Sequence, residues 1–356
     1  MSFRVGFDVG GTFTDFALQA DDGRILTGKR LTTPDDPARA CVEGLRELVA
    51  RAGLGFPDLA QAVHGTTLGS NIVIERKGKN VALVTTRGFR DVLIIGREKR
   101  YQLYDLFIEK PAPLVPRSRI REVTERIAFD GEVLTPLDEA GLRAAARALA
   151  KDGITSVAVC FLHAYANPVH ERRAAEIIRE EAPDVAVSLS SDVSPVIREY
   201  ERTSTTVVNA YVMTAVRDYL ERLERVLADM DGGGYRGRLF VMQSGGGIAT
   251  AETMARFPVR MIESGPAAGA LMAAAYGKRT GHTDLVAFDI GGTTAKLSLV
   301  AGGRPQTIRE FELHRIRLQP GSGIPMNIQA IDLVEIGAGG GSIARAQMGV
   351  IAVGPD

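Results

Sequence analysis

The sequence predicts an α/β protein with mixed sheets, organised as two domains. Its 356 residues exceed the size of one typical domain, which is about 150 residues. Strand-like and helical segments alternate along most of the chain, as in layered α/β proteins. The strongest observation is an internal repeat, because Phe7–Asp15 (FDVGGTFTD) returns late in the chain as Phe288–Lys296 (FDIGGTTAK). The repeat indicates two copies of one domain core.

The first third of the chain predicts a β meander followed by alternating helices and strands. The expected elements, in order, are strands at 4–9, 12–19 and 24–32, a helix from 34 to about 52, a strand at 62–64, a helix ending near 76 and a strand at 80–85. The stretch 88–134 contains Pro111, Pro113 and Pro116 and has no long period. We therefore expect an irregular insertion there, with a strand near 120–129.

Alternation of helices and strands resumes at residue 135. The expected elements are helices at 138–151, 168–181, 203–229 and 266–276, strands at 156–162, 185–189 and 238–242, and a second hairpin that begins at 285. A glycine-rich stretch at 231–234 predicts a flexible joint. We assign residues 1–200 to the first domain and 201–356 to the second.

Composition argues against several classes of protein. Lys plus Arg and Asp plus Glu each number 43, so no general field attracts nucleic acid or an anionic membrane. The cysteines are Cys41 and Cys160, without a CxxC pair, which disfavours a disulfide scaffold and fits a reducing compartment. The sequence has no signal-peptide pattern and no apolar run of about 20 residues. We expect a soluble, cytoplasmic protein without nucleic-acid or membrane partners.

The repeated motif has the residue types that phosphate binding requires. In each copy an apolar strand delivers an aspartate, Asp8 or Asp289, and two glycines and hydroxyl residues follow. Glycines let backbone N–H groups approach phosphate oxygens closely, and a strand-end aspartate can hold Mg²⁺ through its water shell. Two copies make a simple tight turn the weaker interpretation. The expected phosphate-binding residues are Gly10, Gly11, Thr12, Thr14, Gly291, Gly292, Thr293 and Thr294.

Three further residues have two interpretations each. Lys296 could reach a phosphate or face solvent on its strand, and Asp15 could turn toward the cleft or pair locally. His64, at the end of a predicted strand, is a candidate catalytic acid or base. A histidine that is hydrogen-bonded to order the following turn is its other interpretation.

A series of motifs in chain order resembles one protein family. The motifs are Phe7–Asp15, His64–Thr67 (HGTT), Glu199–Tyr211 (EYERTSTTVVNAY), Met242–Gly246 (MQSGG), Glu263–Gly269 (ESGPAAG), Phe288–Lys296 and Glu335–Ala344 (EIGAGGGSIA). Together they resemble the family of hydantoinase A, 5-oxoprolinase and the acetone carboxylase β subunit, within the actin-like and sugar-kinase ATPase superfamily. The resemblance implies the actin-like ATPase fold, with two ribonuclease-H-like mixed-sheet domains that hold ATP and Mg²⁺ between them.

The resemblance also implies function. It favours the ATP-binding subunit of a cyclic amide hydrolase acting on hydantoin or 5-oxoproline, with a partner subunit similar to hydantoinase B and an oligomeric assembly. A subunit of an ATP-dependent ketone carboxylase, or an actin-like nucleotide-binding switch, are the alternatives. Members of the family are longer, so we expect this chain to be a fragment with an incomplete second domain.

A glycine-rich loop late in the chain is a candidate adenosine site. Gly337, Gly339, Gly340 and Gly341 follow a predicted strand and precede a predicted helix at 343–347, and a helix N-terminus favours anions. The glycines at 245–247 and 265–269 are rival positions for the adenosine.

Overall fold

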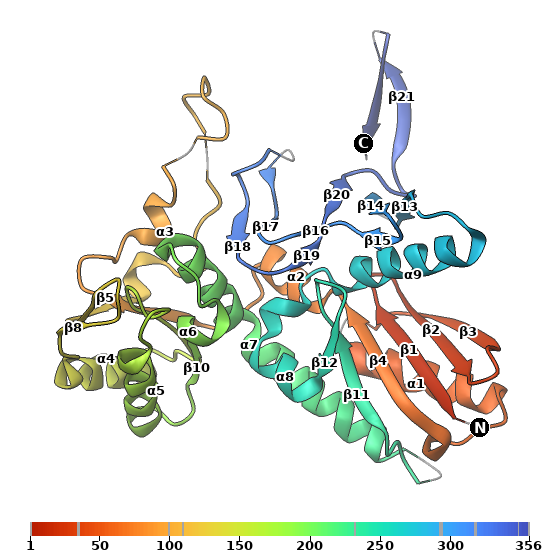
Figure 1. The fold of residues 1–356 in the computed structure, drawn as a ribbon, viewed down its shortest axis with the longest axis horizontal. Coiled ribbons are helices and arrows are strands. Elements are labelled where there is room, and N and C mark those ends of the chain that lie inside the picture. The colour runs from red at the N-terminus through yellow and green to blue at the C-terminus, as the bar shows by residue number, and fades with distance from the viewer. Residues whose placement is uncertain are drawn as a thin grey trace.

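The computed structural model describes residues 2–33, 36–98, 100–108, 110–230, 233–291, 295–316, 319–347 and 349–354. Its first sheet has six strands (Figure 1). In order across the sheet these are β12 (Ile248–Thr250), β11 (Arg238–Met242), β4 (Leu59–Thr66), β1 (Phe3–Val9), β2 (Phe13–Ala20) and β3 (Ile25–Leu31). The first three strands of the chain form an antiparallel meander, whereas β4 runs parallel to β1 and β11 parallel to β4.

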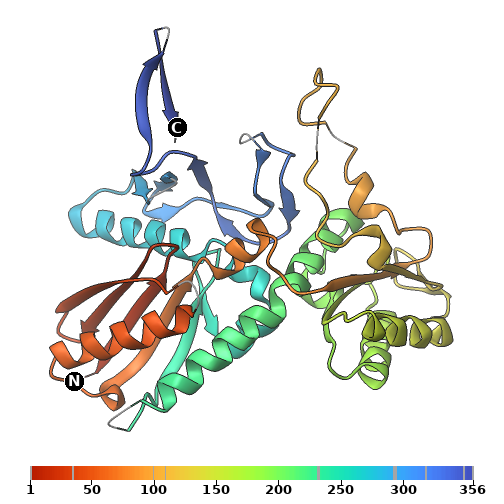
Figure 2. The same cartoon turned by 180° about the vertical axis from the view of Figure 1, so that it is seen from behind.

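Two helices cover one face of this sheet (Figure 2). They are α1 (Pro37–Arg51) and the second half of the long helix α7 (Glu199–Ala228). Alternating burial along β2 turns Phe16 and Leu18 toward this layer. Leu45 and Leu48 of α1 and Leu220 and Leu223 of α7 complete the same core, as period-2 and period-3.6 patterns require. The short helices α2 (Leu68–Ile74) and α8 (Ala251–Arg256) pack on α7.

The segment that follows β4 and α2 contains a second sheet with its own core. Its four strands are all parallel, in the order β10 (Ala186–Leu189), β9 (Ser156–Cys160), β5 (Val81–Thr86) and β6 (Ile120–Val123). Helices α4 (Glu139–Lys151) and α5 (Val169–Glu181) pair with each other beside it, and α7 packs along β9 and β10. Every residue of β5 is buried, as expected for a parallel sheet covered on both faces.

The remaining short elements of this part of the chain lie outside the two sheets or form small hairpins. They are α3 (Val92–Ile95), the hairpin of β7 (Arg126–Ile127) and β8 (Val133–Thr135), α6 (Ser190–Val193), and single 3₁₀ turns at Phe56–Asp58, Arg117–Arg119 and Pro258–Met261.

A third sheet carries the second copy of the motif. It consists of β13 (Leu285–Ile290), β14 (Ala295–Ala301), β15 (Arg304–Pro305) and β20 (Leu333–Ile336). Helix α9 (Ser264–Thr280) contacts β13 and β14 on one side and β4 on the other, so it lies between the first and third sheets (Figure 1). Three two-stranded ladders follow: β16 (Thr307–Ile308) with β19 (Ala330–Ile331), β17 (Phe311–Leu313) with β18 (Ile324–Met326), and β21 (Ile343–Gln347) with β22 (Val350–Gly354).

Most elements agree with the sequence-based expectations, and one differs. The predicted helix at 343–347 is the strand β21, because Gly349, with φ of 80°, permits a tight turn that returns the chain as β22. Strands β11 and β12, which follow residue 200, join the first sheet. Within the described residues, no helix has the length and apolar character that a bilayer-crossing segment needs.

Packing of α1 on the first sheet depends on the absence of a side chain at Gly44. A Cβ at this position would lie 2.2 Å from Cζ of Phe16. We predict that Gly44→Ala lowers the free energy of unfolding by about 1–3 kcal/mol, because overpacking outweighs the gain in helix propensity. Urea denaturation measures the change.

Gly269 is the matched control because it also lies inside a helix. A Cβ there meets no atom within 4 Å, so Gly269→Ala should leave stability unchanged or raise it by up to about 1 kcal/mol. Equal effects of the two substitutions would contradict this account of the packing.

Candidate functional site

The site is built around Asp8, the penultimate residue of β1. In the sheet register Asp8 lies opposite Asp15 on β2 and Gly65 on β4. A Cβ at Gly65 would lie 2.5 Å from Oδ1 of Asp8, and a Cβ at Gly265 of α9 would lie 3.0 Å from the same oxygen. The carboxylate therefore occupies a space that exists because two glycine backbones flank it.

This position is electrostatically costly for an ionised carboxylate. Burial, followed by the charges of Asp15 and Asp289, raises the pKa of Asp8 to about 6. Its Oδ1 is buried and has no hydrogen-bond partner among the described residues. A buried charge without a partner is destabilising, so a cation beside this oxygen would relieve both effects.

The two repeated motifs meet at one cavity. The cavity, with a volume of about 790 Å³, lies between the first sheet, α9 and the strands β13 and β14. Asp8, Asp15, Asp289 and Lys296 all line it, together with the backbone of Gly265. The structure thus brings together three predicted carboxylates and the predicted lysine from residues far apart in sequence.

The N-terminus of α9 forms one wall of this cavity and is anchored to the first sheet. Ser264 Oγ donates a hydrogen bond of 3.0 Å to the carbonyl of Thr66, and it accepts one of 3.3 Å from the Thr66 N–H. The unpaired N–H groups of a first helical turn carry partial positive charge. The wall beside Asp8 is therefore suited to a bound anion.

Lys296 already has acidic partners in the structure. Its ammonium contacts Glu263, the residue before α9, and lies 3.7 Å from Glu335 of β20. Burial lowers its pKa, but Glu263 and Glu335 outweigh burial, so the pKa of Lys296 lies above its usual value. Lys296 is thus a fixed cation that links β14 to the start of α9.

The residues of the first glycine loop divide into two groups. Gly11 and Thr12 are exposed at the turn, and the Gly10 N–H closes the turn with a 3.0 Å bond to the Phe13 carbonyl. Thr14 is buried, and its hydroxyl lies 3.1 Å from that of Thr32. Thr14 therefore stabilises the loop from the protein interior. Asp15 lines the cavity and also pairs with Lys29 at 3.0 Å.

The second glycine loop lies against the glycine-rich stretch near the C-terminus. The Gly340 N–H donates a 2.9 Å bond to the carbonyl of Gly291, which places the loop at 337–341 beside the turn between β13 and β14. The strand β21 follows this loop, so the helix N-terminus expected there is absent. The helix N-terminus at the cavity belongs to α9, and Gly265 and Gly269 of α9 line the cavity wall. Gly292, Thr293 and Thr294 lie outside the described residues.

His64 requires a correction. Consecutive residues on a strand face opposite sides, so His64 faces away from its neighbour Gly65 and from Asp8. It is fully buried, stacks on Phe7 with centroids 4.6 Å apart, and its Nε2 lies 2.9 Å from the Tyr219 hydroxyl. Burial lowers its pKa to about 4, although the Phe7 carbonyl acts in the opposite direction. We therefore assign His64 a structural role in the core beneath the sheet.

Two residues that shape the site, Gly65 and Glu263, were not among the predicted ones, and Gly265 was predicted only as a rival position for the adenosine. Gly65 and Gly265 make room for Asp8, and Glu263 holds Lys296. All three belong to the motifs HGTT and ESGPAAG. The glycines in those motifs were the sequence feature that pointed to these positions. Their contact with Asp8 could not be predicted, because it depends on tertiary packing.

The fold and this paired-aspartate cavity define an α/β protein of the actin-like ATPase class. The match to family models is more specific: residues 4–182 match the hydantoinase/oxoprolinase N-terminal region, and residues 202–356 match hydantoinase/oxoprolinase. The chain belongs to the hydantoinase/oxoprolinase family.

Individual relatives agree with this assignment. The caprolactamase subunit alpha of Pseudomonas jessenii is 36% identical over 99% of this chain and 50% of its own length. The 5-oxoprolinase of Saccharomyces cerevisiae is 30% identical over the whole of this chain and 30% of its own length. The chain thus spans half or less of the length of these relatives.

Two solved structures have the same fold. The ATP-dependent caprolactamase from Pseudomonas jessenii superposes with a TM-score of 0.84 at 33% identity, over 99% of this chain and 50% of that one. The nucleotide-free acetone carboxylase gives 0.84 at 28% identity, with the same coverage. These likenesses confirm the predicted actin-like ATPase fold.

The raised pKa of Asp8 makes stability depend on pH in a definite direction. The carboxyl has a pKa near 3.8 when unfolded and about 6 when folded, so the folded protein binds this proton more tightly. Ionised Asp8 therefore destabilises the fold above pH 6, by about 1–3 kcal/mol, and this cost disappears as the pH falls toward 4.

We predict that Asp8→Asn removes this dependence. Without nucleotide or divalent cations, the stability of the wild type relative to Asp8→Asn should rise as the pH falls from 7.5 to 4.5. Urea denaturation at several pH values measures the difference. The exposed Asp184→Asn serves as the control for loss of a carboxylate. A difference between wild type and Asp8→Asn that stays constant with pH would contradict the burial of an unpaired charge.

Proposed function

We propose that this chain is the ATP-binding part of an enzyme that opens cyclic amides of the hydantoin or 5-oxoproline type. One observation carries the proposal: Asp8 and Asp289, from the two copies of the motif, line one cavity, and a buried oxygen of Asp8 has no partner among the residues that the structure describes. The names of two relatives, a caprolactamase and a 5-oxoprolinase, denote enzymes of cyclic amides.

The carboxylates fit Mg²⁺ better than a metal held entirely by protein. No group of three or more His, Cys, Asp or Glu side chains among the described residues is arranged to hold a metal. Mg²⁺ commonly keeps several waters and takes one or two carboxylates, which Asp8 and Asp289 would supply. When bound there, it would neutralise charge on the phosphates of ATP.

The remaining groups would position the triphosphate. The backbone N–H of Gly11 and the hydroxyl of Thr12 would approach it from the first lobe, and the N–H groups of Gly291 and Gly292 from the second. The first turn of α9 adds donors beside Asp8, and the Lys296–Glu263 pair fixes that turn relative to β14. Phosphoryl transfer depends mainly on such positioning and on charge neutralisation.

The chemistry would activate a carbonyl that is otherwise resistant to water. The amide oxygen attacks the γ-phosphorus of ATP, the bond to the bridging β-oxygen breaks, and ADP departs with that electron pair. The ring nitrogen loses its proton to water, which leaves a phosphorylated imidate. Water then adds to the ring carbon, and collapse of the tetrahedral adduct breaks the ring C–N bond, the nitrogen taking a proton, to give a ring-opened acyl phosphate. A second water hydrolyses the acyl phosphate, which releases inorganic phosphate and leaves a carboxylate.

The likeness to acetone carboxylase favours one alternative. In that case the same ATP site would activate a ketone or bicarbonate for carboxylation. In either case we propose that a second subunit similar to hydantoinase B supplies the rest of the active site within an oligomeric enzyme.

ATP turnover distinguishes these possibilities. We expect phosphate release by the chain with its partner subunit to rise when hydantoin or 5-oxoproline is added, and Asp8→Asn to lower turnover at least 100-fold, about 2.7 kcal/mol in the barrier. Asp184→Asn should match the wild type. Stimulation by acetone with bicarbonate would favour the carboxylase, and stimulation by neither substrate would favour a nucleotide switch. Undiminished turnover by Asp8→Asn would refute its role.

Nucleotide affinity tests the first glycine loop separately. A Cβ at Gly11 meets no protein atom within 4 Å, so Gly11→Val should fold normally and obstruct only an approaching phosphate. We predict at least a 10-fold loss of affinity for a fluorescent ATP analogue in the presence of Mg²⁺, with an unchanged melting temperature. Unchanged affinity would remove this loop from the site.

A further inference from the structure

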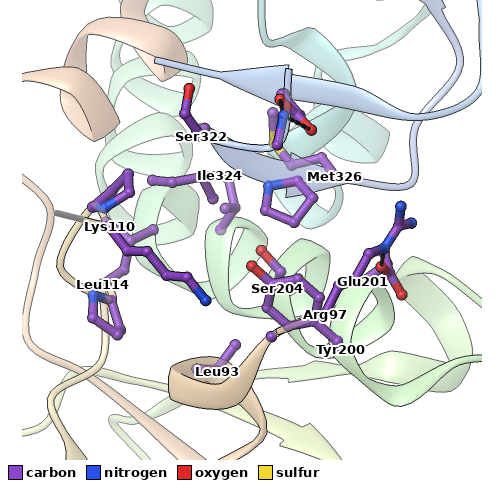
Figure 3. A pocket seen from close by; sticks show the side chains of 18 of the residues that line it. Leu93, Arg97, Lys110, Leu114, Tyr200, Glu201, Ser204, Ser322, Ile324 and Met326 are labelled. Carbon is purple, nitrogen blue, oxygen red and sulfur yellow. Dashed lines mark hydrogen bonds and ion pairs between the residues drawn. The ribbon is translucent and has the colours of Figure 1, made fainter. Parts of the chain in front are cut away.

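A second cavity, of about 490 Å³, lies in a different part of the molecule (Figure 3). It is formed by the loop that follows β5, including α3, by the first turns of α7, and by the β17–β18 hairpin. No described residue lines both this cavity and the one at Asp8. We call it the hairpin cavity.

The hairpin cavity lies where parallel sheets place ligands. The chain leaves the carboxyl end of β5 into the loop that lines it, and β5 stands between β6 on one side and β9 on the other. In open parallel sheets, ligands bind outside the carboxyl ends of strands at such a reversal of strand order. Topology therefore supports a binding site on grounds independent of the side chains.

The walls combine an apolar surface with a few polar groups. The apolar side chains come from all three contributing segments: Leu93, Leu114, Val207, Ile324 and Met326. The side chain of Lys110 extends into the cavity opposite Tyr200 and Ser204 (Figure 3). This composition and volume are typical of small-molecule sites.

Nearly all charges around the cavity neutralise one another. Arg97 pairs with the buried Glu201 and, at 3.1 Å, with Glu310. Arg315 lies 3.2 Å from Glu312, and Glu312 also accepts a 2.8 Å bond from the Gly321 N–H.

Lys110 is the exception among these charged groups. Neither its ammonium nor the hydroxyls of Tyr200 and Ser204 bond to any other residue that the structure describes. A cation and two hydroxyl donors thus share an apolar cavity, with no partner among the described residues.

We propose that the hairpin cavity binds a small organic carboxylate with an apolar body. The carboxylate accepts charge-assisted hydrogen bonds from Lys110 and bonds from the hydroxyls of Ser204 and Tyr200. The apolar body packs on Leu93, Ile324 and Met326. Because the cavity shares no residue with the Asp8 site, the proposal is independent of ATP binding.

Binding of two matched probes to the full chain, without nucleotide, tests the proposal. The probes are cyclohexanecarboxylate and the neutral cyclohexanecarboxamide, followed by NMR of methyl-labelled methionines. Met326 reports on the hairpin cavity, and Met242 and Met272 report on the other one. We expect the carboxylate to shift Met326 and to bind more tightly than the amide.

Variants separate charge from shape. Lys110→Gln should weaken carboxylate binding at least 10-fold and leave the amide unaffected. Lys151→Gln, at the exposed end of α4, should change neither affinity. Ser204→Phe fills the cavity and should abolish binding of both probes; its folding is checked by its melting temperature.

Several results would overturn the proposal. Equal affinity for both probes, or an unchanged carboxylate affinity in Lys110→Gln, would refute anion recognition. Shifts confined to Met242 and Met272, or no binding of either probe at millimolar concentration, would refute the site itself. Because Lys110 is exposed, its substitution should not prevent folding. The Lys110→Gln binding experiment therefore remains informative even if Ser204→Phe fails to fold.

Discussion

The architecture of the site depends on one carboxylate, that of Asp8, which lies in a crevice where its Oδ1 has no hydrogen-bond partner among the described residues. A Cβ at Gly65 would collide with this carboxylate and one at Gly265 would press against it, and burial together with Asp15 and Asp289 raises its pKa to about 6. The parallel register of β1 with β4 sets one side of this space. The hydrogen bond between Ser264 and Thr66 sets the other side of this space, because it fixes the start of α9.

The sequence was sufficient to predict the parts of the site that lie on one continuous segment. The repeated aspartate-glycine motif predicted Asp8 and Asp289 as a pair, and the structure places both at one cavity. Local patterns could not predict that β4 and α9 supply the flanking glycines, since packing of distant segments creates that contact. His64 illustrates the same limit: which face of β4 it occupies depends on the register with β1, and the register turns it into the core.

The fold shows a similar division between local and non-local information. Amphipathic segments such as α4 and α5 were predicted close to their observed bounds, because their periodicity persists over several turns. The short segment at 343–347 has too few residues for periodicity to decide, and pairing with β22 makes it a strand. Likewise, β11 and β12 complete the first sheet from beyond the predicted boundary, since strand pairing joins segments that are distant in sequence.

A crystal structure with Mg²⁺ and a non-hydrolysable ATP analogue tests the central claim most directly. The account predicts that the triphosphate lies between the Gly10–Gly11 and Gly291–Gly292 turns, with the metal and its waters next to Asp8 and Asp289. A nucleotide bound elsewhere on the molecule, or a metal distant from both aspartates, would contradict it.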